Sequence, residues 1–126
     1  MLNPTGIAFA LYHITDVARA RKFYEGALGF KVCSEMEFAP GQWWIEYDAC
    51  GPSGLAITNY GQTTVPASGG PGVAIEITNY DQALAAVQAA GIALSWGPHE
   101  CAACRSVGFR DPDGNELFLH QRKRTA

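Results

Sequence analysis

Two cysteines separated by two residues form a chemically suggestive pattern in this chain. The segment reads Cys101-Ala-Ala-Cys104 and directly follows His99 and Glu100. These four side chains could nominally supply the ligands of a zinc ion, and a CxxC pair could also act as a redox dithiol. A thioredoxin-like pair needs a helix start, whereas this segment is predicted to be a loop leading into a strand. We therefore interpret the cysteines as ordinary packing residues and keep zinc or redox roles as the alternative.

Two titratable side chains adjoin or interrupt apolar stretches that are typical of buried strands. His13 closes the run Ile7–Tyr12, and Glu76 lies within Val73–Ile77. A buried carboxylate is unfavourable unless it is paired or solvated, so Glu76 indicates a cavity role. His13 could instead be a hydrogen-bonded histidine at an interface. The sequence contains no glycine-rich phosphate loop, Walker motif or Ser/His/Asp signature.

Length and composition indicate one compact globular protein. Of 126 residues, 48% are hydrophobic and 17% are charged, which fits a packed core rather than disorder. The formal net charge of −3 argues against nucleic acid as a partner, because phosphate binding needs a basic field. The longest apolar run is too short to span a membrane, and no basic region precedes it as in a secretory signal. With only four cysteines, too few for a disulfide scaffold, we expect a cytoplasmic protein.

The elements that must position these residues occur twice along the chain. The tetrapeptide Ile-Thr-Asp-Val at 14–17 is repeated as Ile-Thr-Asn-Tyr at 77–80, and each copy begins a helical pattern. The third residue of each copy can cap the helix N-terminus, and Gly29 and Gly91 can end the two helices. The strands predicted to follow are Phe30–Glu35, Trp43–Asp48 and Leu55–Asn59, then Ile92–Trp96, Arg105–Arg110 and Glu116–His120.

This order predicts an α+β fold built from two βαβββ modules. The first module is predicted to span residues 1–61 and the second residues 72–126, with a polar linker over 62–71. Neither half is large enough to bury a good core alone. The two modules should therefore pack together or against a second chain.

The sequence resembles the vicinal oxygen chelate superfamily, which includes glyoxalase I, extradiol dioxygenases, fosfomycin-resistance enzymes and bleomycin-resistance proteins. The match in the first half covers residues 13–30, with Phe-Tyr at 23–24 and Leu-Gly at 28–29. In the second half it covers residues 109–120, with Asp-Pro-Asp-Gly-Asn at its centre. The resemblance implies curled mixed sheets around a cavity, with the helices outside. Because one fold hosts unrelated chemistries, it indicates the fold more strongly than the activity.

Metal enzymes of this superfamily place four His, Glu or Gln ligands on the cavity faces, two in each module. The matching positions here are Phe9, Ala56, Gly72 and Phe118. None of these residues, nor either neighbour of Ala56, can donate a lone pair to a divalent metal. The resemblance therefore implies a member without the usual metal site, and no cofactor is expected.

Alternate residues of a strand point to the same face of the sheet. The residues two and four places from these four positions are therefore predicted to line the cavity as well. His13 and Glu76 occupy matching positions in the two modules and could face each other across a pseudo-twofold axis. The adjacent Trp43 and Trp44 should point to opposite faces, one into the core and one toward a ligand. The predicted ligand-binding residues are Phe9, Leu11, His13, Trp44, Glu46, Glu76, Cys104, Phe118 and His120, with Ala74, Ser106 and Glu116 on the same faces.

Three functions are compatible with this lining. The first is metal-independent binding of a small organic ligand, as in bleomycin-resistance proteins, with the aromatic residues stacking and Glu46, Glu76 and Glu116 attracting a cationic antibiotic. The second is a lyase, isomerase or dioxygenase whose shifted metal set comes from His13, Glu76, His120 and one further glutamate, or a metal-free enzyme with His13 or Glu76 as base. The third is a non-catalytic interaction module. The resemblance also implies a homodimer, and exposed strand edges that need covering support it.

Overall fold

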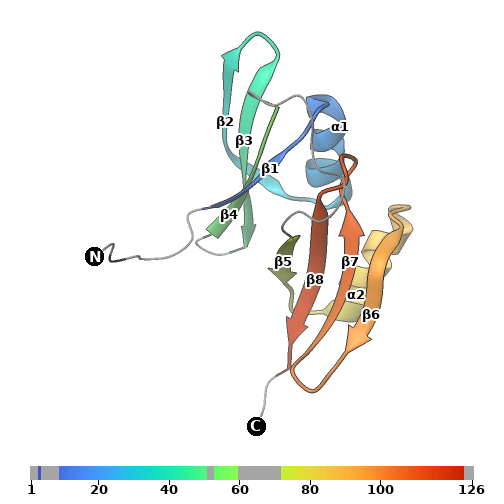
Figure 1. Ribbon diagram of the computed structural model, residues 1–126. Coiled ribbons are helices and arrows are strands. Elements are labelled where there is room, and N and C mark those ends of the chain that lie inside the picture. Colours follow the sequence, from blue (N-terminus) through green and yellow to red (C-terminus); the bar gives the residue numbers. More distant parts are fainter. Residues whose placement is uncertain (1–2, 4–8, 51–52, 60–71, 124–126) are drawn as a thin grey trace.

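The computed structural model of the protein describes residues 3, 9–50, 53–59 and 72–123. These residues form two four-stranded mixed sheets with strand orders β1-β4-β3-β2 and β5-β8-β7-β6. In Figure 1 the first sheet lies in the upper half and the second in the lower half, each with its helical segment beside it. In each sheet the first strand pairs in parallel with the last, and the other pairs are antiparallel.

The first half contains β1, one continuous helical segment and three further strands. Asp16 caps the helix, because its Oδ1 accepts the backbone N–H of Arg19 at 3.0 Å. Gly29, with φ 72°, follows the helical segment in the left-handed conformation that glycine adopts most readily. The elements are β1 Phe9–His13, α1 Val17–Arg21, the π-helical turn η1 Lys22–Ala27, β2 Lys31–Ala39, β3 Gln42–Cys50 and β4 Ser53–Thr58.

The second half repeats this order, which confirms the predicted α+β fold of two βαβββ modules. Asn79 caps its helix by accepting the backbone N–H of Gln82 at 3.1 Å. The elements are β5 Gly72–Glu76, α2 Tyr80–Ala89, β6 Leu94–Glu100, β7 Cys104–Arg110 and β8 Glu116–Arg122. The predicted module limits stay a prediction, because the linker 62–71 lies outside the described residues. No helix in the described ranges is long and apolar enough to cross a membrane.

Two strands, β2 and β6, continue four residues past the ends that the sequence pattern predicted. β2 continues to Ala39 because the next residues make a tight turn, in which the N–H of Gly41 donates to Glu37 Oε2 at 2.9 Å. β6 continues past Pro98 to Glu100. It is the edge strand of its sheet, where a proline without an N–H group is tolerated.

The helix-side faces of both sheets contribute to one hydrophobic core. Tyr24 of η1 is fully buried at its centre, and its ring stacks on that of Tyr47 with centroids 5.7 Å apart. The ring of the neighbouring Phe23 contacts that of Phe109 in β7, with centroids 6.4 Å apart. The two modules therefore pack on each other through the first helical segment.

The turn between β7 and β8 joins the two modules. Asp111 accepts the Tyr24 hydroxyl at 2.8 Å and the backbone N–H of Asn115 at 2.8 Å. Asn115 Nδ2 donates to the backbone oxygen of His13 at 3.0 Å and to Asp111 Oδ2 at 2.8 Å. The Asp-Pro-Asp-Gly-Asn motif thus does more than close a hairpin, because it also ties the end of β1 to the second sheet.

Candidate functional site

Strand pairing places the site residues predicted for the first module on one face of their sheet. Leu11 of β1 pairs with Ala56 of β4, and Ala56 pairs with Glu46 of β3. In the same way His13 pairs with Thr58, and Thr58 pairs with Trp44. Residues paired directly across strands point to the same side of a sheet. We call this side the first open face; it carries Phe9, Leu11, His13, Met36, Phe38, Trp44 and Glu46.

An aromatic cluster covers part of the first open face. The Trp44 ring makes edge contacts with Phe9 and Phe38, at centroid distances of 5.6 and 6.4 Å. Phe9 is 39% exposed, Phe38 49% and Met36 55%, which is unusual for side chains of this size. Trp43 packs against the core instead, so the two tryptophans point to opposite faces as predicted.

Glu46 lies directly beside this cluster. Its Oε2 accepts the Trp44 indole N–H at 3.0 Å. In the part of the chain that the structure describes, no Lys or Arg forms an ion pair with it. The first open face therefore combines aromatic surface with a half-buried carboxylate that forms no ion pair with a described Lys or Arg.

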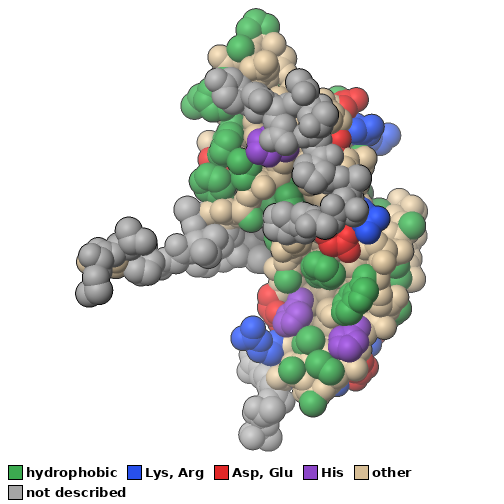
Figure 2. All heavy atoms as spheres, in the orientation of Figure 1, with side chains coloured by type: hydrophobic (Ala, Val, Ile, Leu, Met, Phe, Trp, Pro, Cys, Tyr) green, Lys and Arg blue, Asp and Glu red, His purple; other side chains and the backbone are tan. Residues whose placement is uncertain are grey.

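The residues predicted for the second module also share one face. Glu76 lies opposite His120, which lies opposite Ser106, and Ala74 is aligned with Phe118. We call this side the second open face; it carries Ala74, Glu76, Trp96, Cys104, Ser106, Glu116, Phe118 and His120. Figure 2 shows histidine and hydrophobic side chains together over the β5–β8 sheet. The Trp96 ring is 45% exposed and contacts Phe118 edge-on at 5.9 Å.

Glu76 is bonded within its own sheet rather than to His13. Its Oε1 lies 2.5 Å from His120 Nδ1, and its Oε2 accepts the backbone N–H of Arg122 at 2.7 Å. The bond from Arg122, followed by that from His120, holds the pKa of Glu76 below its usual value. The parallel pairing of β5 with β8 puts His120 beside Glu76, and the predicted facing of His13 and Glu76 across a pseudo-twofold axis stays a prediction.

The charge of Glu116 is compensated as well. Its Oε2 accepts Arg110 Nε at 2.9 Å, and its Oε1 accepts the Ser95 hydroxyl at 2.7 Å. Of the three glutamates expected to attract a cation, Glu116 has an arginine partner and Glu76 a histidine partner. Only Glu46, among these three, has no basic partner in the described residues.

The residues present do not fit the metal site of the superfamily. At the third ligand position, a Cβ added to Gly72 would lie 2.5 Å from Cε2 of Phe118, which is itself the fourth position. The first position, Phe9, contacts Trp44, and the second, Ala56, is fully buried. Among the described residues, no three His, Cys, Asp or Glu side chains are grouped to hold a metal ion.

Some residues of the two open faces were not in the predicted lining. Met36, Phe38 and Trp96 are exposed and belong to these faces. The spacing of two between Met36 and Phe38 was the available signal, since alternate strand residues share a face. Cys104 is half-buried at the start of β7, two residues from Ser106.

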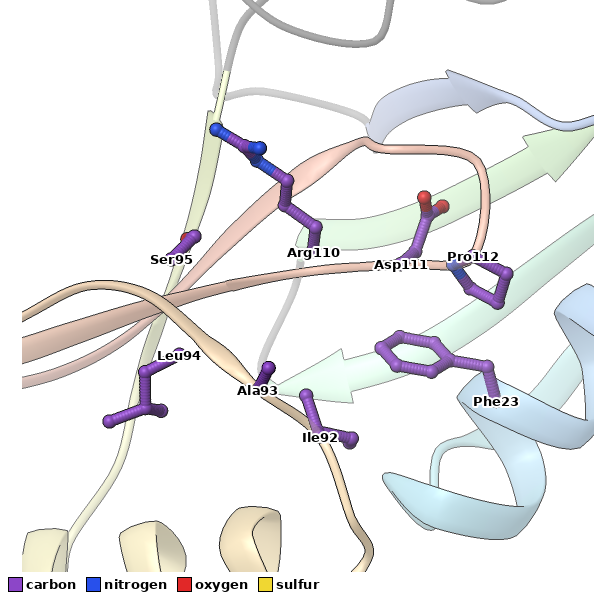
Figure 3. Close-up of a pocket in the computed structure, with 8 residues that line it drawn as sticks. All are labelled: Phe23, Ile92, Ala93, Leu94, Ser95, Arg110, Asp111 and Pro112. Atoms are coloured by element: carbon purple, nitrogen blue, oxygen red, sulfur yellow. The ribbon is translucent and has the colours of Figure 1, made fainter.

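A hollow lies at the junction of the two modules (Figure 3). It has a volume of about 390 Å³ and is lined by Phe23, residues 92–95 and residues 110–112. Its walls are mainly apolar. Its two charged groups are already engaged, Arg110 with Glu116 and Asp111 with Tyr24.

The fold and the sequence together identify the class of protein. The chain belongs to the Glyoxalase/Bleomycin resistance protein/Dioxygenase superfamily, whose family model matches residues 6–119. A search of curated proteins gave no match.

Solved structures with the same fold come from several bacteria. TnmS3, an antibiotic binding protein from Streptomyces sp. CB03234, is 22% identical, with a TM-score of 0.81 over 98% of this chain and 100% of that one. A glyoxalase/bleomycin resistance protein from the same Streptomyces is 24% identical, with a TM-score of 0.76 over 92% and 100%. A glyoxalase family protein from Enterococcus faecalis is 21% identical, with a TM-score of 0.72 over 92% and 97%. At these identities the similarity establishes the fold alone.

Proposed function

We propose that this protein binds a small aromatic cation, such as a cationic antibiotic, without the help of a metal ion. The observation that carries this proposal is the position of Glu46 beside Phe9, Phe38 and Trp44 on the first open face. A cation over an aromatic ring gains about 0.5–2 kcal/mol, more when water is excluded. The carboxylate of Glu46 would add a charge-assisted contact, and the exposed rings would stack on the aromatic part of the ligand.

A second copy of the chain would complete the binding cavity. Among the described residues, Phe9 and Phe38 contact Trp44 on the first open face, and Trp96 contacts Phe118 on the second. Each sheet has its other face on the core, so the exposed aromatic side chains are what a partner would cover. We infer a homodimer in which an open face of one subunit lies over an open face of the other, with the ligand between them.

Two further considerations support this choice. One structural neighbour, TnmS3, is an antibiotic binding protein, which is compatible with ligand binding in this fold. The metal-dependent alternative has less support, because the Glu76–His120 pair supplies at most two of the ligands it needs. A cytoplasmic location is part of the proposal, since Cys33, Cys101 and Cys104 are free thiols.

Calorimetric titration with two ions of the same ring system tests the proposal. N-methylacridinium is a planar aromatic cation, and acridine-9-carboxylate is the matched anion. We expect the cation to bind at least about tenfold more tightly than the anion, and Glu46→Gln to weaken cation binding by about tenfold, or about 1.4 kcal/mol. Glu116→Gln is the control and should have a smaller effect, because Arg110 already compensates Glu116.

Either of two results would contradict the proposal. The first is equal affinity for the two ions. The second is cation binding that Glu46→Gln leaves unchanged. Circular dichroism of both variants would establish that they are folded.

A further inference from the structure

The turn between β6 and β7 holds two thiols close together at the surface. The backbone N–H of Cys101 donates to the carbonyl of Cys104 at 3.0 Å, which closes the turn. A second bond, from the N–H of Lys123 to the carbonyl of Ala103 at 2.8 Å, fixes the turn to the end of β8. The sulfur atoms of Cys101 and Cys104 lie 3.9 Å apart. Cys101 is exposed and Cys104 is half-buried.

We propose that Cys101 and Cys104 form a redox-active dithiol that reduces small-molecule disulfides and closes reversibly to an intramolecular disulfide. This assignment replaces the interpretation of the pair as ordinary packing residues. It is independent of the ligand proposed for the first open face.

The reaction consists of two thiol–disulfide exchanges. The Cys101 thiolate attacks one sulfur of a disulfide RSSR, so that a Cys101–SR bond forms, the S–S bond of RSSR breaks, and RS⁻ leaves and takes up a proton. Cys104 then gives up its proton and attacks Cys101 Sγ, which expels the second RS⁻ and forms the Cys101–Cys104 disulfide. The dithiol loses two electrons and two protons, and RSSR becomes two RSH.

The proposed reaction needs Cys101 to attack first and Cys104 to attack second. The surroundings of the two sulfur atoms favour this order. Backbone N–H groups of Ala103 and Cys104 point at Cys101 Sγ and lower the pKa of its thiol, and the thiol of Cys104 lowers it further. The Lys123 ammonium acts in the same direction. Burial, followed by the neighbouring Cys101, raises the pKa of Cys104. A lowered thiol pKa at the exposed Cys101 and a raised one at the half-buried Cys104 suit an attacking and a resolving cysteine.

The distance between the sulfurs is compatible with closure. A disulfide bond is about 2.05 Å long, so the sulfurs must approach each other from 3.9 Å. Both cysteines lie in a turn closed by its own backbone hydrogen bond.

Reaction with 5,5′-dithiobis(2-nitrobenzoate), a disulfide with a coloured thiol product, tests the proposal. The full chain is used with Cys33→Ser and Cys50→Ser, so that only the pair reacts. We expect two coloured thiols released per chain, no retained label, and a mass lower by two hydrogen atoms. Adding Cys104→Ser should give one released thiol and one retained mixed disulfide.

Exposed Cys33, kept in a Cys101→Ser/Cys104→Ser/Cys50→Ser chain, serves as the rate control. Cys101 should react about tenfold faster than Cys33, because a thiolate is the nucleophile. Two retained mixed disulfides on the pair, or a Cys101 rate no higher than that of Cys33, would overturn the proposal. Circular dichroism checks that each variant is folded.

Discussion

At the scale of single residues, the bonding partners of a glutamate determine whether its charge can attract a ligand. The open sheet faces carry Glu46, Glu76 and Glu116. His120 binds Glu76 and Arg110 binds Glu116. Among the described contacts, the carboxylate of Glu46 accepts only the indole N–H of Trp44. Since a compensated carboxylate offers little attraction to a ligand, Glu46 is the residue on which cation binding should depend.

The buried tyrosines predict how stability responds to alkaline pH. Tyr24 donates to Asp111 and Tyr47 to Glu25, at 2.8 and 2.7 Å. Burial is the main reason that the pKa of both hydroxyls is raised, and it raises the pKa of Tyr12 to about 12. A pKa raised in the folded state contributes stability that is complete below the unfolded value, about 10, and is lost as pH rises through the folded value.

We therefore expect the free energy of unfolding to fall steadily above about pH 10. Absorbance at the tyrosinate band, followed together with circular dichroism, measures this directly. Tyr24 should ionise only as the protein unfolds, and Tyr24→Phe should make the alkaline decline less steep. Titration of every tyrosine near its ordinary pKa without loss of secondary structure would show that the hydroxyls are not held as described.

At the scale of elements, the short turn between β7 and β8 holds side chains that connect the two modules. Asn115 is buried and bonds both Asp111 and the backbone of β1. Nearby, Asp113 Oδ1 accepts the Thr15 hydroxyl at 2.5 Å and Arg19 Nη2 at 3.1 Å. The turn therefore connects the second sheet to β1 and to the start of α1.

Asn115→Ala should lower the free energy of unfolding by about 2–4 kcal/mol. It removes a hydrogen bond to the part-buried carbonyl of His13 and one to the Asp111 carboxylate. The first kind of bond contributes about 0.5–1.5 kcal/mol and the second about 1.5–3 kcal/mol. Urea denaturation followed by tryptophan fluorescence measures the change. Glu35→Ala is the control and should stay within about 1 kcal/mol, because its ion pair with Arg21 is exposed. Equal effects of the two substitutions would rule out a joining role for the turn.

At the scale of the whole molecule, the two open faces predict association. Sedimentation equilibrium should give a mass about twice the 13.5 kDa of the chain. Trp96→Glu should shift the protein toward monomer, because a charge placed in a desolvated contact is strongly unfavourable. Gln88→Glu, which adds a charge on the exposed side of α2, should leave the dimer intact. A wild-type monomer would contradict the dimeric cavity, whereas binding of N-methylacridinium at Glu46 can still be tested on its own.

The sequence by itself determined the features that depend on local periodicity. Repeated strand and helix patterns predicted the two βαβββ modules, and the capping roles of Asp16 and Asn79 follow from side-chain chemistry within one turn. The alternation of strand residues also predicted which side chains share a face, because the period of two is a property of the strand alone. The absence of ligating atoms at Phe9, Gly72 and Phe118 could likewise be read from the residue types.

Only the tertiary structure decided which residues meet. The pairing of Glu76 with His120, the compensation of Glu116 by Arg110 and the extension of β6 beyond Pro98 all depend on strand register. The hollow at the module junction and the bond from Tyr24 to Asp111 depend on how the modules pack. Register and packing arise from contacts between residues far apart in sequence, where a shift of one position changes every partner. Periodicity within a single strand or helix therefore cannot specify them.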